Sequence, residues 1–137
     1  MTAEFPAIGA IHHVCLTVTD LDRSIDWYRW VLGFELAVRR QIDDADKAIL
    51  GHPGGLTISL ISHGPRAAPD GFSEFRPGLD HLAFEVADLD ELERWRSILD
   101  NAKIKHDGIV TGMRGHLIAF RDLDGIALEF YTRRPAI

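Results

Sequence analysis

Two histidines open two copies of the same phrase in this sequence. His13 begins the stretch H-V-C-L-T-V-T-D-L-D, and His81 begins H-L-A-F-E-V-A-D-L-D. Near the end of the chain, Glu129 stands in the apolar setting A-L-E-F-Y, where an ionised carboxylate is costly to bury unless it is paired or bound to a metal. Two imidazoles and one carboxylate form a ligand set for a divalent ion that leaves positions open for substrate and water. His13, His81 and Glu129 are therefore candidate metal ligands.

A simpler interpretation of the same residues stays open at this point. The two histidines can be unrelated strand residues, and Glu129 can pair with an arginine such as Arg121. The two interpretations differ in whether the three side chains meet, which depends on the elements that carry them.

The repeated phrase belongs to a longer duplication. The segment G-L-T-I-S-L at 55–60 matches G-I-A-L-E-F at 125–130. Such self-similarity indicates two copies of one supersecondary unit. We expect a single domain over residues 1–137, with module one at about 8–62, a Pro- and Gly-rich linker at 63–77 and module two at about 78–133.

Each module is predicted to contain one helix among four strands. Asp20 and Asp88 are suitable N-caps for helices that follow the first strand of each module, and Gly33 is a suitable end for the first helix. Alternating and β-branched residues predict strands at 11–18, 34–40, 45–50, 56–62, 79–86, 104–111, 116–121 and 126–132. The expected fold class is α+β, with two tandem βαβββ modules whose curled mixed sheets surround a central cleft.

Strand alternation predicts which side chains face that cleft. Apolar residues such as Leu16 and Leu128 belong under the helices, so the residues between them point the other way. By this rule His13, Ser59, His81 and Glu129 all point into the cleft. We expect Cys15, Ser59 and Ala119 to line a substrate pocket, although a small cysteine on a strand is more often a buried filler.

Two further residues are candidates for catalysis. Tyr131 lies on the same face as Glu129 and can hydrogen-bond a metal-bound oxygen, or it can pack in the core with its hydroxyl at the rim. His116 borders a Gly-containing turn that could close over the pocket, which makes it a candidate acid–base catalyst, although a histidine at a strand edge is usually solvated.

Composition limits the partners of the chain. Of its 137 residues 46% are hydrophobic, and the formal net charge is −6, which disfavours nucleic acid or an anionic membrane as the main partner. Cys15 is the single cysteine, so neither an intramolecular disulfide nor a cysteine-rich metal site is expected. Neither a signal-peptide pattern nor a long apolar run occurs, so we expect a cytoplasmic protein that acts on a small molecule.

These segments resemble the vicinal oxygen chelate superfamily, which includes glyoxalases, bleomycin-resistance proteins and ring-cleaving dioxygenases. The resemblance rests on H-V-C-L-T-V-T-D-L-D-R-S-I-D-W-Y-R-W-V-L-G-F (13–34), G-L-D-H-L-A-F-E-V-A-D-L-D (78–90) and I-A-F-R-D-L-D-G-I-A-L-E-F (118–130). It implies paired βαβββ modules around a divalent metal, with ligands at positions that fall on His13, His81 and Glu129. This ligand set leaves the ion open among Fe, Mn, Co, Ni and Zn.

Two positions depart from the family's patterns. A glutamate or glutamine ligand of glyoxalase-like members falls on Ser59, so water is expected in that place and the lyase and epimerase assignments lose support. A tyrosine of the ring-cleaving dioxygenases and of the fosfomycin-inactivating transferases falls on Ala119, which removes a hydroxyl that would orient substrate.

The sequence predicts a divalent-metal-dependent enzyme of the glyoxalase/dioxygenase type. It would act on a small substrate chelated through neighbouring oxygens, by lyase, isomerase or dioxygenase chemistry. The alternative is a metal-free binding or drug-sequestering protein of the bleomycin-resistance type, although such sequences tend to lose the ligand residues. Members of the superfamily are often dimers, and Trp30 falls on the outer side of the first helix, where an indole suggests a subunit contact. We therefore expect a homodimer.

Overall fold

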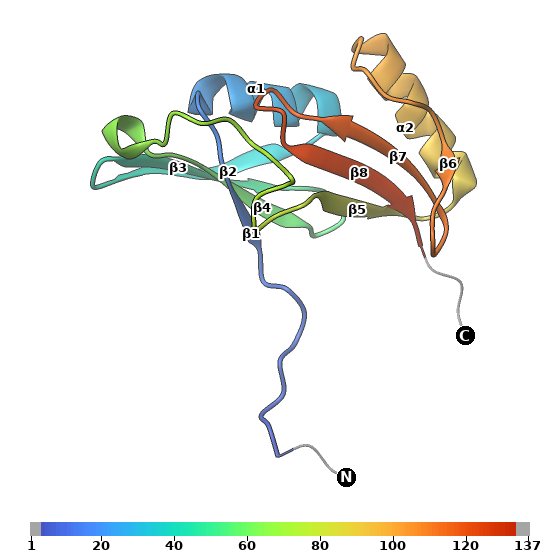
Figure 1. Ribbon diagram of the computed structural model, residues 1–137, viewed down its shortest axis with the longest axis horizontal. Helices are drawn as coiled ribbons and strands as arrows, with labels where there is room; N and C mark the ends of the chain where they lie inside the picture. The colour runs from blue at the N-terminus through green and yellow to red at the C-terminus, as the bar shows by residue number, and fades with distance from the viewer. Residues whose placement is uncertain (1–3, 134–137) are drawn as a thin grey trace.

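The computed structural model describes residues 4–133 of the chain. Its elements are β1 (Val14–Thr17), α1 (Leu21–Leu32), β2 (Glu35–Ile42), β3 (Ala45–Gly51), β4 (Thr57–Ser62), the 3₁₀ turn η1 (Gly64–Arg66), β5 (Leu82–Val86), α2 (Leu89–Asn101), β6 (Val110–Thr111), β7 (His116–Arg121) and β8 (Ala127–Thr132). The predicted order βαβββ occurs twice (Figure 1). Within residues 4–133, neither helix is long and apolar enough to cross a membrane.

Each module forms its own four-stranded sheet. The strand order is β1-β4-β3-β2 in the first sheet and β5-β8-β7-β6 in the second. In both sheets the first strand pairs in parallel with the last, and the other neighbours are antiparallel. Cys15 pairs with Ser59 in one sheet as Ala83 pairs with Glu129 in the other. This matching register confirms the duplication and the α+β fold class, and both sheets are open.

Both helices begin where the sequence predicts. The Asp20 side chain accepts a hydrogen bond from the Arg23 backbone N–H, and Asp88 accepts one from the N–H of Glu91. These caps satisfy amide groups that have no partner inside the helix. Gly33 ends α1 in the left-handed conformation with φ of 80°, which costs glycine little because it lacks a Cβ.

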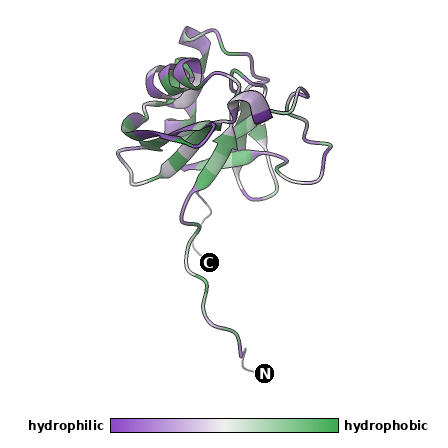
Figure 2. Ribbon diagram, turned by 90° about the vertical axis from the view of Figure 1, so that its left-hand side faces the viewer, coloured by the Kyte–Doolittle hydropathy of each residue, from purple (hydrophilic) through white to green (hydrophobic). Residues whose placement is uncertain are grey.

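One continuous hydrophobic core joins the two modules. Trp27 of α1 lies 6.5 Å from Phe120 of β7, measured between ring centroids, and Phe34 lies 6.1 Å from Phe84 of β5. Figure 2 shows hydrophobic residues concentrated on the strands and hydrophilic ones on the helices. Because the helix-side faces of both sheets share this core, the opposite faces of both sheets point away from it.

The strands at three places are shorter than predicted. The strands predicted to begin at 11 and 79 start instead at Val14 and Leu82, since each pairs only with the last strand of its module and that partner begins one residue before the paired position. The strand predicted at 104–111 is reduced to Val110–Thr111. There the chain turns through positive φ at Lys103 and Gly108, which interrupts an extended strand.

Candidate metal centre

The face of each sheet opposite the helices carries the candidate ligands. We call this surface the open face. In the first module Leu16 is 3% exposed under α1, whereas His13 and Cys15 are exposed on the open face. In the second module Leu128 is fully buried, and the alternation places Glu129 on the open face. The predicted facing of both strands is confirmed.

His81 and Glu129 lie together on the open face of the second sheet. The imidazole Nε2 of His81 is 3.4 Å from the Glu129 Oε1, and the Glu129 side chain is only 16% exposed. The other ring nitrogen of His81, Nδ1, lies 2.7 Å from Asp80 Oδ1. With Nδ1–H donating to Asp80, Nε2 is the ring nitrogen that faces Glu129; it carries a proton toward that carboxylate when the imidazole is charged and a lone pair when the imidazole is neutral. The hydrogen bond to Asp80 raises the pKa of His81; burial lowers it and the charge of Glu129 adds to the rise.

Arg121 does not neutralise Glu129. Its guanidinium binds both carboxylate oxygens of Glu74, with Nη2–Oε1 at 3.0 Å and Nη1–Oε2 at 3.3 Å. Within residues 4–133, His81 is the basic residue that forms an ion pair with Glu129. The part of the simpler interpretation that pairs Arg121 with Glu129 is therefore wrong.

The spacing of His81 and Glu129 fits two ligands of one ion. Donor atoms about 2.1 Å from a first-row divalent ion, at roughly 90–110° to each other, lie about 3.0–3.4 Å apart. The observed separation of 3.4 Å falls at the upper end of that range. Asp80 completes an arrangement in which a carboxylate holds the outer nitrogen of a ligand histidine and fixes its orientation.

His13 lies apart from this pair, which corrects the expectation of one central cleft. It lines a cavity of about 570 Å³ together with His12, whereas His81 and Glu129 line another of about 540 Å³. Residues 4–133 of one chain contain no group of three or more His, Cys, Asp or Glu side chains that could hold a metal. The physical reason is the shared core: both helices lie on one side of the sheets, so the open faces are neighbours and do not oppose each other (Figure 1).

Each module therefore carries half of the candidate centre. The register that places Glu129 next to β5 places Ser59 next to β1. We call His13 and Ser59 the first half-site, and His81 and Glu129 the second half-site. Ser59 is 2% exposed and its hydroxyl is a weak metal ligand. Cys15 beside it is exposed; burial raises the pKa of its thiol, and the charge of Lys47 partly offsets this.

Of the remaining candidates, Ala119 and Tyr131 share the face of Glu129 in the second sheet, and His116 does not. Ala119 is directly opposite Glu129 on β7, so it borders the candidate ligand pair. The Tyr131 hydroxyl accepts the backbone N–H of Arg114 at 3.0 Å, which ties down the turn before β7. His116 lies by alternation on the face of buried Ile118, away from Glu129. The structure therefore does not bring His116 to the ligand pair.

No sequence pattern predicts the contacts of Asp80 and Glu74, the two other acidic residues of this region. Asp80 is simply the residue before His81, and its contact with Nδ1 depends on the turn into β5. Glu74 belongs to the connection between the modules, which has no periodicity from which a position could be predicted. Its contact with Arg121 joins residues far apart in the sequence.

Comparison with known proteins gives consistent matches over nearly the whole chain. Residues 10–130 match the model of the Glyoxalase/Bleomycin resistance protein/Dioxygenase superfamily. The structure of a glyoxylase/bleomycin resistance protein/dioxygenase domain from Frankia sp. EAN1pec superposes with a TM-score of 0.87 and 37% sequence identity, covering 96% of each chain.

Two curated relatives share less of their sequence with this chain. Metallothiol transferase FosB of Staphylococcus haemolyticus is 28% identical over 132 residues, which cover 91% of this chain and 84% of FosB. MhqA of Bacillus subtilis is 25% identical over 127 residues. The match covers 86% of this chain but only 38% of the length of MhqA.

Proposed function

The chain belongs to the glyoxalase/bleomycin resistance protein/dioxygenase superfamily, and on this basis we propose that it is a divalent-metal-dependent enzyme acting on a small substrate chelated through neighbouring oxygens. The observation that carries the proposal is the contact of 3.4 Å between His81 Nε2 and Glu129 Oε1, with Asp80 behind the histidine. A bound divalent ion would supply Lewis-acid polarisation of a substrate oxygen. The ion is one of Fe, Mn, Co, Ni or Zn, since this ligand set suits each of them.

Two copies of the chain complete the ligand set. The first half-site supplies one histidine and the second supplies a histidine with a carboxylate. Within one chain His13 lines a different cavity from His81 and Glu129. A twofold dimer that places the first half-site of one copy over the second half-site of the other forms two equivalent centres. His13, His81 and Glu129 then act together as ligands, as the sequence predicts, but from two chains.

Exposed apolar side chains support this dimer. On the open face of the first sheet Val38 is 40% exposed and Ile49 is 36% exposed, next to the exposed Cys15. A face of this kind is stabilised when a second surface covers it. A homodimer through the open faces would bury these residues and enclose both half-sites.

Other residues around the second half-site would bind and orient the substrate. Ala119, opposite Glu129, leaves space beside the ligand carboxylate. The Tyr131 oxygen accepts the Arg114 N–H, so its own proton remains available to donate to a substrate oxygen on the open face. Ser59 supplies no second carboxylate to transfer protons, which weighs against lyase and isomerase chemistry and leaves dioxygenase chemistry among the three reaction types.

Elemental analysis of protein purified without a histidine tag tests the proposal. After reconstitution with each candidate ion, we expect about one ion per chain, because a twofold dimer has one centre for each copy. Metal content no higher than that of the Glu129→Gln variant for every ion would overturn the proposal. It would favour instead a metal-free binding protein that uses the cavity of about 570 Å³ lined by apolar residues such as Phe34 and Trp95.

A further inference from the structure

We propose that Arg121 forms a carboxylate-binding subsite beside the candidate metal centre, which Glu74 occupies until a substrate carboxylate replaces it. The inference rests on the proposed function, because it assigns the substrate a second feature besides its neighbouring oxygens. The substrate class is a small molecule with two adjacent oxygens at one end and a carboxylate at the other.

The contact between Arg121 and Glu74 shows that this guanidinium is arranged to bind a carboxylate. Nη2 and Nη1 each reach one oxygen of Glu74, at 3.0 and 3.3 Å. Such a two-pronged contact matches the planar fork of arginine to the two oxygens of a carboxylate. A ligand carboxylate of the same shape can make the same pair of hydrogen bonds.

A second contact keeps Arg121 in place without Glu74. Its Nη1 also donates to the backbone carbonyl of Gly125 at 2.9 Å. Gly125 belongs to the turn between β7 and β8, whose backbone is itself held by the hydrogen bond from Gly125 N–H to Asp122 O at 3.1 Å. The guanidinium therefore stays oriented when the carboxylate beside it is exchanged.

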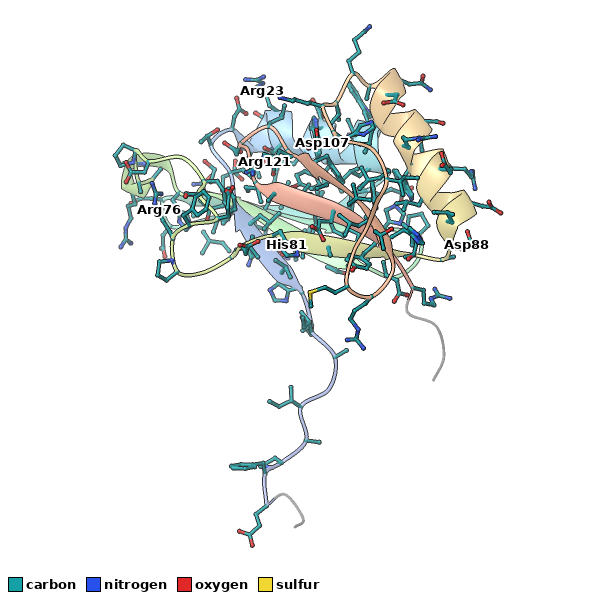
Figure 3. The ribbon with its side chains drawn as sticks, turned by 45° about the vertical axis from the view of Figure 1, so that its right-hand side comes forward. Arg23, Arg76, His81, Asp88, Asp107 and Arg121 are labelled. Atoms are coloured by element: carbon teal, nitrogen blue, oxygen red, sulfur yellow. The ribbon has the colours of Figure 1, made fainter. Side chains whose placement is uncertain are left out.

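Arg121 and the second half-site share one cavity. Alternation along β7 places Arg121 on the same face as Ala119, the residue opposite Glu129. Glu74, His81, Arg121 and Glu129 all line the cavity of about 540 Å³, and Figure 3 labels His81 and Arg121 in this part of the molecule. A cavity of this size is in the range of small-ligand sites.

Glu74 is suited to be displaced. It comes from the connection between the modules, and its contact with Arg121 is open to solvent, with side chains 27% and 51% exposed. Arg121 lowers the pKa of Glu74, so this carboxyl is an ionised competitor for the guanidinium. A substrate already held at the neighbouring centre presents its own carboxylate to Arg121 at high effective concentration. A surface ion pair is weak, so this carboxylate can displace Glu74.

Binding of two matched probes tests the subsite. The probes are 3,4-dihydroxybenzoate and its methyl ester, which share the neighbouring oxygens and differ in the charged carboxylate. Calorimetry would compare the metal-loaded wild-type protein with Glu74→Ala, Arg121→Gln and Lys105→Gln. Lys105 lines the same cavity and serves as the control for loss of one positive charge.

We expect the acid to bind wild-type protein about tenfold more tightly than the ester, as a charge-assisted bidentate contact would give. Glu74→Ala should increase the affinity for the acid by up to about fivefold, because competition from an exposed ion pair can lower the affinity by no more than that. The affinity for the ester should stay unchanged. Arg121→Gln removes the preference for the acid, and Lys105→Gln retains it.

Two results would overturn the subsite. The first is that Glu74→Ala binds the acid no more tightly than it binds the ester. The second is that Lys105→Gln and Arg121→Gln lose the preference for the acid to the same extent. Repeating the titrations after removal of metal by a chelator separates the two proposals. Ester binding that does not depend on metal contradicts the proposed function. In that case the change in the preference for acid over ester between wild type and Glu74→Ala still tests whether Arg121 binds the carboxylate.

Discussion

His81 Nε2 lies 3.4 Å from Glu129 Oε1, and both side chains are positioned within one sheet of one chain. The parallel pairing of β5 with β8 fixes Glu129 beside the strand that His81 precedes. The second half-site therefore exists before any partner or ion binds. In the proposed dimer, assembly would have to supply only the remaining histidine, His13 of the second copy.

Substitution of Glu129 tests the second half-site directly. Glu129→Gln keeps the size of the side chain and removes its negative charge, so we expect metal affinity to fall by at least about tenfold, because loss of an outer-shell partner alone costs that much. Glu85→Gln is the matched control, since Glu85 is also on the open face but pairs with Arg133 at 2.9 Å. Elemental analysis and thermal unfolding of both variants give the measurement. Equal metal content in the two variants would remove Glu129 from the centre.

Mixing two inactive variants tests whether the centre is shared between copies. His13→Ala and Glu129→Gln each destroy both centres of a homodimer, but a mixed dimer keeps one centre that has His13 from one copy and Glu129 from the other. Random exchange of subunits therefore restores about one quarter of the wild-type metal content and activity. Refolding the variants together and separately checks this. A centre formed within one chain would show no recovery in the mixture.

The oligomeric state distinguishes two candidate interfaces. Ile49 on the open face is 36% exposed, and Trp30 on the outer side of α1 is 79% exposed, as the sequence predicted. A glutamate at an interface must be desolvated, so Ile49→Glu should give a monomer that no longer binds metal, while Trp30→Glu stays dimeric. Light scattering on size-exclusion fractions measures both. Dissociation by Trp30→Glu alone would place the interface on α1, where the sequence suggested a contact.

Local rules were sufficient to predict the side of the sheet on which each candidate ligand lies. Strand alternation and the helix caps depend on neighbouring residues, which is why the facing of Cys15, the facing of Glu129 and the N-cap of α1 at Asp20 are confirmed. The strand predicted at 104–111 failed for a similar local reason. Ile104 and Ile109 pack against the core from a loop, and apolar residues alone do not distinguish this from a strand.

The relation between the two half-sites could not be predicted in this way. It depends on how the modules share one core, through contacts such as Trp27 with Phe120 that join distant parts of the chain. Alternation says which face a residue occupies and nothing about which sheet opposes that face. For the same reason the sequence does not predict the pairing of Arg121 with Glu74, which lies 47 residues away in the chain.

A buried hydrogen bond joins the two modules beside their shared core. The Tyr28 hydroxyl of α1 donates to Asp122 Oδ2 at 2.7 Å, and Asp122 also accepts the backbone N–H groups of Asp124 and Ile126. Burial raises the pKa of the Asp122 carboxyl, and the hydrogen bond from Tyr28 opposes that rise. The native state therefore binds this proton more tightly than the unfolded state, and the contribution of Asp122 to stability decreases as pH rises from the usual carboxyl range through the raised pKa.

Replacing Tyr28 with phenylalanine should have an effect that depends on pH. In the wild-type protein the Tyr28 hydrogen bond stabilises the ionised form of Asp122, so its loss costs more when Asp122 is ionised. We expect the free energy of unfolding to fall by about 1.5–3 kcal/mol above the pKa of Asp122 and by less below it. Urea unfolding at a series of pH values measures this difference. Tyr131→Phe is the control, because the Tyr131 hydroxyl accepts a backbone N–H and its loss should cost the same at each pH. A constant cost for Tyr28→Phe across the series would show that ionisation of Asp122 does not change the strength of this hydrogen bond, which contradicts the prediction.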